Sequence, residues 1–163
     1  MQRTLSRVEK LAFDDGIEAS LSSWEHKLEV FGSGPWASLF AGRADASLIG
    51  QPVDGFLADL ESPIDITFRA PQRFDSVDTK AAFLPLFVEG RVFGADATLR
   101  VAVAVNGRIA AFADSYEGGD GAWRFATVIP VESLVQGRNA VELYAVERSG
   151  QDLRLLRVGP RLP

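Results

Sequence analysis

The sequence predicts a mainly β protein: an antiparallel β-sandwich, immunoglobulin-like or jelly-roll-like, of about seven strands with a short helical N-terminal extension. Three observations carry this prediction. Segments of alternating apolar and polar residues follow one another after Pro63. Turn residues separate these segments at intervals of about 8–12 residues, as in sandwiches and barrels. No long helical pattern lies between them, which argues against a parallel sheet built from βαβ units.

The composition of the chain changes near residue 63. Residues 1–62 are expected to form a partly helical N-terminal extension or linker, and residues 63–163 the β-sandwich domain. The best helix candidate is Ile17–Val30, where apolar residues recur every three or four positions, and Trp36–Ala41 is expected to form a second helical turn. Trp24 and Trp36 are expected to pack this part against the sheet.

Each expected strand has an alternating or largely apolar pattern. In Ala97–Val105 the alternation places Leu99 and three valines on one face and the alanines on the other. In Ala122–Ile129 it places Trp123 and Phe125 together on one face. The strands expected after Pro63 are Ile64–Arg69, Leu84–Phe93, Ala97–Val105, Arg108–Tyr116, Ala122–Ile129, Asn139–Arg148 and Asp152–Val158.

Turn residues define the connections between these strands. Asn106-Gly107 lies directly between two apolar alternating runs and predicts a two-residue hairpin, because both residues tolerate a positive φ. Glu117–Gly121 (EGGDG) predicts a second, looser hairpin turn. Pro130–Gln136 is expected to form one helical turn closed by Gly137, and Ser149–Gln151 a last turn.

Composition excludes several classes of site. The 163 residues include no cysteine, which excludes disulfides, thiol nucleophiles and Cys-zinc sites within this chain. His26 is the only histidine, so a metal site of several imidazoles is excluded, and we expect His26 to lie on a surface. The net charge of -5 argues against nucleic-acid binding, and we expect neither a nucleic-acid partner nor a cofactor.

The hydropathy pattern gives no transmembrane segment. No stretch approaches the roughly 18 apolar residues that span a bilayer, so we expect no direct membrane insertion by this segment. Met1–Lys10 is polar and lacks the apolar region of a signal peptide.

Two groups of residues are candidates for chemistry. Asp114, Glu117 and Asp120 cluster around the second hairpin turn, where carboxylates are usually solvated or bonded to their own backbone. Aromatic side chains exposed on a sandwich can stack on sugar rings, and the candidates for carbohydrate binding are Trp123, Tyr116 and Tyr144. Packing in the core is the alternative for each of them. We predict no catalytic residue and no metal ligand.

A series of short phrases resembles the C-terminal region of large bacterial membrane-anchored proteins identified as sulfatase-like, of the alkaline-phosphatase superfamily. The resemblance covers about Lys27 to Val146, and its motifs are short and made of common strand and turn residues. The phrases are Lys27–Gly34 (KLEVFGSG), Ser47–Val53 (SLIGQPV), Val88–Val92 (VEGRV), Val101–Ala111 (VAVAVNGRIAA), Arg124–Pro130 (RFATVIP) and Gly137–Val146 (GRNAVELYAV).

The resemblance implies a non-catalytic accessory domain. Proteins of that family carry a membrane segment, then a metal-dependent hydrolase domain outside the cytoplasmic membrane, then a tail like this chain. Their nucleophile and their Asp and His metal ligands have no counterpart here, so the chain itself is not expected to be an enzyme. The implied location is periplasmic or extracytoplasmic as part of an inner-membrane protein, and the implied partner is the catalytic domain of the parent protein.

Two alternative functions remain at this point. A carbohydrate-binding module that recognises envelope glycans would need two or three exposed coplanar aromatic rings. A small stand-alone enzyme would need two opposed carboxylates in a cleft.

Overall fold

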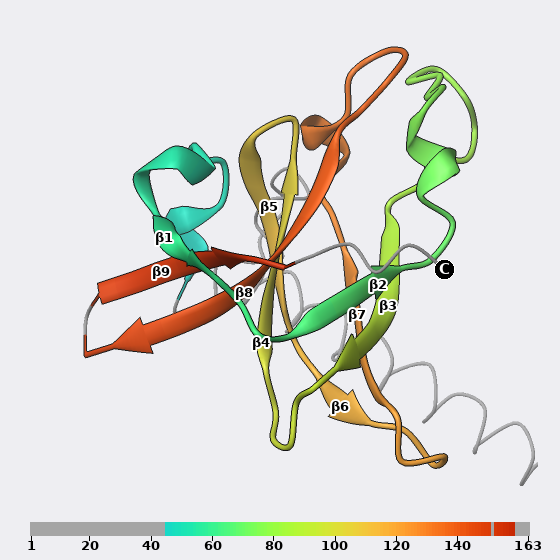
Figure 1. The fold of residues 1–163 in the computed structure, drawn as a ribbon. Helices are drawn as coiled ribbons and strands as arrows, with labels where there is room; N and C mark the ends of the chain where they lie inside the picture. The colour runs from blue at the N-terminus through green and yellow to red at the C-terminus, as the bar shows by residue number, and fades with distance from the viewer. Residues whose placement is uncertain (1–44, 151, 159–163) are drawn as a thin grey trace, which may run out of the picture. The chain divides into compact units, whose positions relative to one another are not determined.

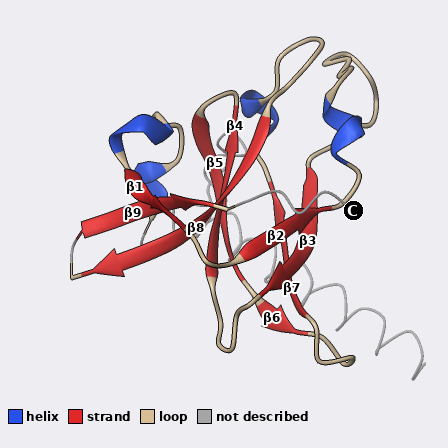
Figure 2. Ribbon diagram, in the orientation of Figure 1, coloured by secondary structure: helices blue, strands red, loops and turns tan. Residues whose placement is uncertain are grey.

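The computed structural model describes residues 45–150 and 152–158 (Figure 1). These residues form two β-sheets in a sandwich-like arrangement, so the predicted mainly β fold is confirmed (Figure 2). The predicted helices Ile17–Val30 and Trp36–Ala41, and with them His26, lie outside the described residues. Within the described part the helical segments are short 3₁₀ turns: Ala46–Leu48 (η2), Val53–Gly55 (η3), Pro71–Phe74 (η4) and Val131–Ser133 (η5).

The first sheet has five strands. Their bounds are Leu57–Glu61 (β1), Arg100–Val105 (β4), Arg108–Asp114 (β5), Val141–Ser149 (β8) and Asp152–Arg157 (β9). Their spatial order is β1-β9-β8-β4-β5. Neighbours in this sheet are antiparallel except β1 and β9, which are parallel.

The second sheet has four strands and is antiparallel throughout. Its strands are Asp65–Phe68 (β2), Phe87–Phe93 (β3), Tyr116–Glu117 (β6) and Trp123–Val128 (β7). Their order is β2-β3-β7-β6. Gly90 lies at the centre of β3, where an added Cβ would be 1.9 Å from the carbonyl oxygen of Thr67. Only glycine therefore allows β2 and β3 to approach as closely as they do.

Each of the seven predicted strands overlaps an observed strand, but two differences appear. The predicted strand Arg108–Tyr116 is divided at Ser115, so that β5 belongs to the first sheet and β6 to the second. The strand β1 was not predicted; it lies in the part that the sequence assigned to the extension, residues 1–62. In the structure, residues 45–62 contribute an edge strand and part of the core of the first sheet.

Ser115 holds the chain where it changes sheets. Its side chain is buried, and its hydroxyl accepts a hydrogen bond of 2.7 Å from the Leu99 N–H. Its own N–H donates to the Leu99 carbonyl oxygen at 2.7 Å. Leu99 lies just before β4 and Ser115 just after β5. The two bonds therefore satisfy both main-chain polar groups of Leu99 beyond the end of the β4–β5 pairing.

The hairpin of β4 and β5 is buried on both faces. Ala102 and Ala104 pack against Val53, Ile109, Phe112, Tyr144 and Leu155 on one face. Val101, Val103 and Val105 project to the opposite face, as predicted, and are also buried. A strand whose two faces are both buried needs a cover on each side.

Residues 50–53 supply part of one cover and bind the outer edge of β5 at its first residues. The N–H of Gly50 donates to the Ile109 carbonyl oxygen at 2.7 Å, and the Ile109 N–H donates to the Gln51 carbonyl oxygen at 3.0 Å. The Val53 N–H donates to Gly107 at 3.0 Å. These bonds occupy the first part of an edge that would otherwise be open to pairing with another chain.

The predicted Asn106-Gly107 hairpin turn is present between β4 and β5. Val105 and Arg108 are paired across it, and φ is 51° at Asn106 and 74° at Gly107. Buried Asn139 accepts a hydrogen bond of 2.9 Å from the Asn106 side-chain amide and binds the backbone of Val135 in both directions. The turn is therefore joined to the η5 loop.

We predict that Gly107→Val lowers the free energy of unfolding by about 1 kcal/mol or more, because a β-branched residue resists a positive φ. Chemical denaturation of the full chain measures this change. Gly55→Ala is the control, since Gly55 has an ordinary φ and open space around its Cα. Equal stability of the Gly107→Val protein and the wild type would contradict the assigned turn.

Candidate functional site

The three aromatic residues predicted for carbohydrate binding do not come together. Tyr116 is 51% exposed on β6, whereas Trp123 is half-buried on β7. Tyr116 is paired with Arg124, the residue after Trp123, so Tyr116 and Trp123 project from opposite faces of the second sheet. Tyr144 lies in the first sheet and is only 3% exposed.

The prediction for Tyr144 needs a correction, because its ring belongs to the core. It lies on the face of the first sheet that carries Ala102, with which it is paired. Val53 packs in the same cluster, from the segment before β1. No pattern in the sequence indicates that this segment covers the sheet, so the ring could be assigned to either environment. In the structure it offers no face to a sugar.

The carboxylates of Asp114, at the end of β5, and of Asp120 form ion pairs with arginines. An Asp114 oxygen lies 3.2 Å from Arg100, and an Asp120 oxygen lies 2.6 Å from Arg124. A backbone hydrogen bond from Ala122 and the charge of Arg124 lower the pKa of Asp120 below its ordinary value of 3.8. Among the described residues, no group of three or more His, Asp or Glu side chains is placed to hold a metal ion.

The outer face of the second sheet carries a row of aligned polar side chains. Strand pairing places Thr67 of β2 beside Arg91 of β3, Arg91 beside Arg124 of β7, and Arg124 beside Tyr116 of β6. We call these four residues the arginine row. It crosses all four strands of the sheet at right angles to them.

A hollow of about 330 Å³ lies along part of this row. Glu89 and Arg69 border it on one side, and they form an ion pair of 3.0 Å. The hollow is lined by Thr67, Phe68, Arg69, Glu89, Gly90, Arg91 and Arg124.

Apolar side chains flank the arginine row on the same face. Phe87 is 51% exposed and is paired with Val128, which is also exposed. Phe93 is exposed on the other side of the row, and strand alternation places it on the face of Arg91. We call Phe87, Phe93 and Val128 the apolar flank.

The two central arginines differ in their surroundings. Arg124 is held by Asp120 and lies against Gly118, where an added Cβ would be 3.1 Å from its Nε. That Nε is buried without a hydrogen-bond partner. Arg91 is exposed and has no hydrogen-bond or ion-pair partner among the described residues. The row therefore contains one fixed guanidinium and one that is available to a ligand.

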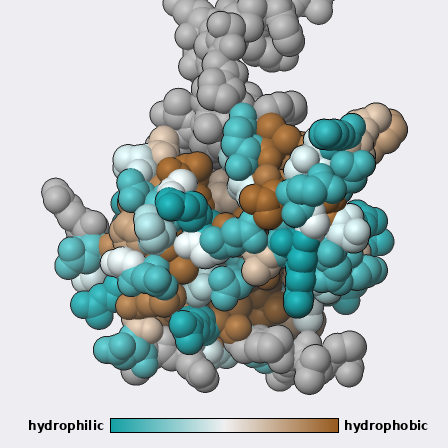
Figure 3. Space-filling view, turned by 90° about the horizontal axis from the view of Figure 1, so that it is seen from above, coloured by the Kyte–Doolittle hydropathy of each residue, from teal (hydrophilic) through white to brown (hydrophobic). Residues whose placement is uncertain are grey.

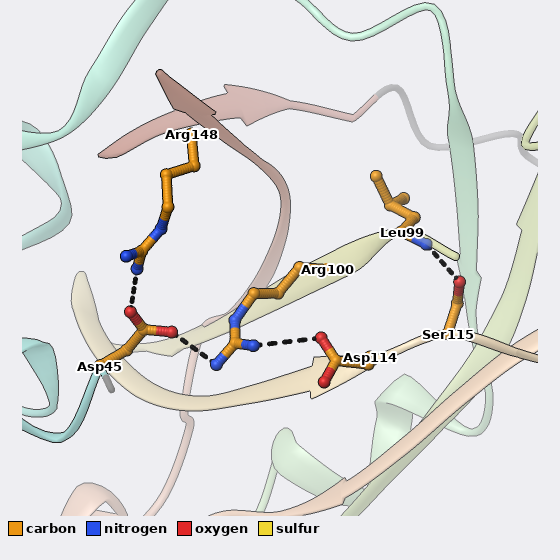
Figure 4. A network of polar contacts seen from close by, with 6 residues as sticks. All are labelled: Asp45, Leu99, Arg100, Asp114, Ser115 and Arg148. Carbon is orange, nitrogen blue, oxygen red and sulfur yellow. Dashed lines mark hydrogen bonds and ion pairs between the residues drawn. The ribbon is translucent and has the colours of Figure 1, made fainter. Parts of the chain in front are cut away.

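A second polar cluster lies on the first sheet, around Asp45 (Figure 4). The Asp45 carboxylate is 2% exposed, and one oxygen lies 2.5 Å from Nη2 of Arg100 on β4. Its other oxygen binds Arg148 of β8. Arg100 also reaches Asp114 and lies 5.5 Å from the centre of the Phe112 ring.

This second cluster is structural rather than a binding site. Asp45 immediately precedes η2, and its two arginines come from two adjacent strands. The carboxylate therefore fixes the start of the covering segment to the sheet. Each of its oxygens lies against a guanidinium group, and its burial leaves almost none of it open to solvent.

Sequence reasoning did not select the arginine row. In the predicted strands Leu84–Phe93 and Ala122–Ile129, alternation places Arg91 and Arg124 on the face away from the buried residues. The sequence could therefore predict that each arginine faces outward. It could not predict that residues of different strands are aligned, because the alignment depends on which strands pair and in which register.

Comparisons with known proteins give no further identification: no family model, no curated protein and no solved structure matches this chain. No helix among the described residues is long and apolar enough to cross a membrane. On the face seen from above in Figure 3, hydrophobic residues form separate patches between hydrophilic ones.

We predict that Asp45→Asn lowers the free energy of unfolding by about 2 kcal/mol, because it weakens two charge-assisted contacts of a buried carboxylate. The side chains of Arg100 and Arg148 are 29% and 45% exposed, so water compensates part of the loss. Denaturant unfolding measures it. Asp114→Asn is the control, with a change below about 1 kcal/mol, because Asp114 is exposed. Equal effects of the two variants would show that Asp45 is no anchor.

We also predict a loss of stability in alkali that depends on Tyr144. Burial, and then the nearby charge of Glu142, raise the pKa of Tyr144 above its ordinary value of 10.0. The unfolded chain therefore releases this proton first, and the free energy of unfolding falls as the pH rises above 10.0. Urea unfolding between pH 9 and 11 should give a shallower fall for Tyr144→Phe than for the exposed control Tyr116→Phe. Identical slopes would refute this assignment.

Proposed function

We propose that this chain is a non-catalytic accessory domain that docks onto the catalytic domain of a membrane-anchored sulfatase-like hydrolase. The proposed location is extracytoplasmic. The parent family is proposed on the resemblance of the sequence phrases. The observation that carries the docking role is the exposed outer face of the second sheet, with its arginine row and apolar flank.

The two sheets differ in how their outer faces are covered. Val53, with Leu48, Ile49 and Phe56, packs on the outer face of the first sheet, so part of the chain itself serves as its cover. On the second sheet, Phe87, Phe93 and Tyr116 remain exposed. Exposed large apolar groups that are gathered on one face are typical of an interaction surface.

The composition of this face fits a protein partner. Arginine and aromatic residues are enriched in protein–protein interfaces, whereas lysine and glutamate are depleted. The arginine row and the apolar flank together contain two arginines, two phenylalanines and a tyrosine. They also cover neighbouring strands of one sheet, which holds them in fixed positions.

Recognition of envelope glycans is a second candidate function. It is favoured by the exposed ring of Tyr116, which stands beside Arg124 and can stack on a sugar. The support is weaker, because Trp123 and Tyr144 do not share its plane. A glycan array with the wild-type chain and Tyr116→Ala separates the two candidates: binding that is lost in the variant favours the glycan.

We predict that Phe87→Ser weakens binding to the hydrolase domain at least tenfold, or about 1.4 kcal/mol. The measurement uses the full chain and the purified hydrolase domain encoded in the same reading frame, by biolayer interferometry. Phe83→Ser is the matched control, because Phe83 is 93% exposed in a loop outside the second sheet. It should change the Kd less than twofold.

Two results would overturn the proposal. One is a reading frame that encodes no hydrolase segment. The other is an equal loss of binding in the Phe87→Ser and Phe83→Ser proteins, which would mean that the second sheet does not carry the interface.

A further inference from the structure

We propose that Arg91 and Arg124 form an oxyanion-binding site, and that in the docked complex this site receives the carboxylate of an aspartate or glutamate of the partner protein. The existence of the site depends on the arginine row alone. The identity of its occupant rests on the proposed docking function.

The pairing of the strands brings two like charges together. Arg91 and Arg124 are directly opposite each other on β3 and β7. Like charges at such positions destabilise a sheet. An anion between the two guanidinium groups would remove the repulsion and replace it with two attractions. Asp120 compensates part of the charge of Arg124, so the unfavourable contact in the unliganded sheet falls mainly on Arg91, and a bound oxyanion would relieve it.

The charges around the hollow leave an excess of positive charge. Its lining contains three arginines and one glutamate, a net charge of +2, and Asp120 beside Arg124 reduces this to +1. Glu89 is engaged by Arg69, and Asp120 by Arg124. Arg91 is the cation that remains. The chain as a whole has a net charge of -5, so the positive charge of this site is a local feature of this face.

The shape of the site suits a planar oxyanion. A guanidinium group donates two parallel hydrogen bonds to a carboxylate, which fixes the position of the ligand as well as its charge. Thr67 stands next to Arg91 in the arginine row and can add a hydroxyl donor. The hollow beside them, of about 330 Å³, has room for a carboxylate with its side-chain carbons.

The surroundings favour a protein carboxylate over an acidic sugar. Phe87, Phe93 and Val128 flank the arginine row and have no side-chain group that could bind sugar hydroxyls. A charged pair surrounded by apolar contacts is typical of protein interfaces, where the surrounding residues exclude water from the pair. Binding of an acidic glycan is the competing outcome, and the test includes it.

The site is tested by NMR titration of the full chain with glutarate and with sulfate, at an ionic strength held constant with chloride. We expect the Arg91 and Arg124 Nε–Hε signals to shift and to saturate, whereas the exposed Arg154 of β9 stays unchanged. Arg91→Gln should weaken binding at least tenfold, and Arg154→Gln should not. Shifts of equal size at all three arginines, or no saturation, would overturn the site.

The occupant is tested separately with the hydrolase domain. Arg91→Glu should weaken docking at least tenfold, and a lysine that replaces the contacting carboxylate of the partner should restore it. If Phe87→Ser disrupts docking and Arg91→Glu does not, docking stands and the carboxylate occupant is wrong. Glutarate binding without any docking would leave the oxyanion site and reject the proposed function. Array binding to acidic glycans that is lost in Arg91→Gln would overturn the protein carboxylate.

Discussion

The β4–β5 hairpin is the part of the fold on which the rest depends, because both of its strands are buried on both faces. Its valines and its alanines each require a separate cover. The second sheet lies on one side, and the segment around Val53 packs on the other. The Asp45 carboxylate fixes that segment by binding arginines of β4 and β8. A buried charge is thus used to hold an apolar cover in place.

Local patterns were sufficient to predict most of the strands and the central turn. The alternation in Ala97–Val105 and the Asn106-Gly107 pair both report interactions between residues that are close in sequence. They could not reveal β1, whose partner β9 lies at the far end of the chain. They also missed the division at Ser115, because an extended chain that changes sheets keeps its alternating pattern.

The candidate site was accessible to sequence reasoning only in part. Alternation identifies Arg91 and Arg124 as outward-facing residues of their own strands, but their alignment depends on pairing between β3 and β7. Tyr144 illustrates the opposite limit. Alternation within β8 cannot tell whether the second face of the sheet is open to water or covered, and here a distant segment covers it. Exposure is a property of the whole fold and not of the strand.

The parallel pairing of β1 and β9 has a mechanical consequence. The two strands are the first and last of the described unit, and Leu155 and Ser62 donate main-chain hydrogen bonds across the pair. A tension that pulled the start of β1 away from the end of β9 would act along both strands, in shear. The bonds of the pair would then share the load and would not open one after another.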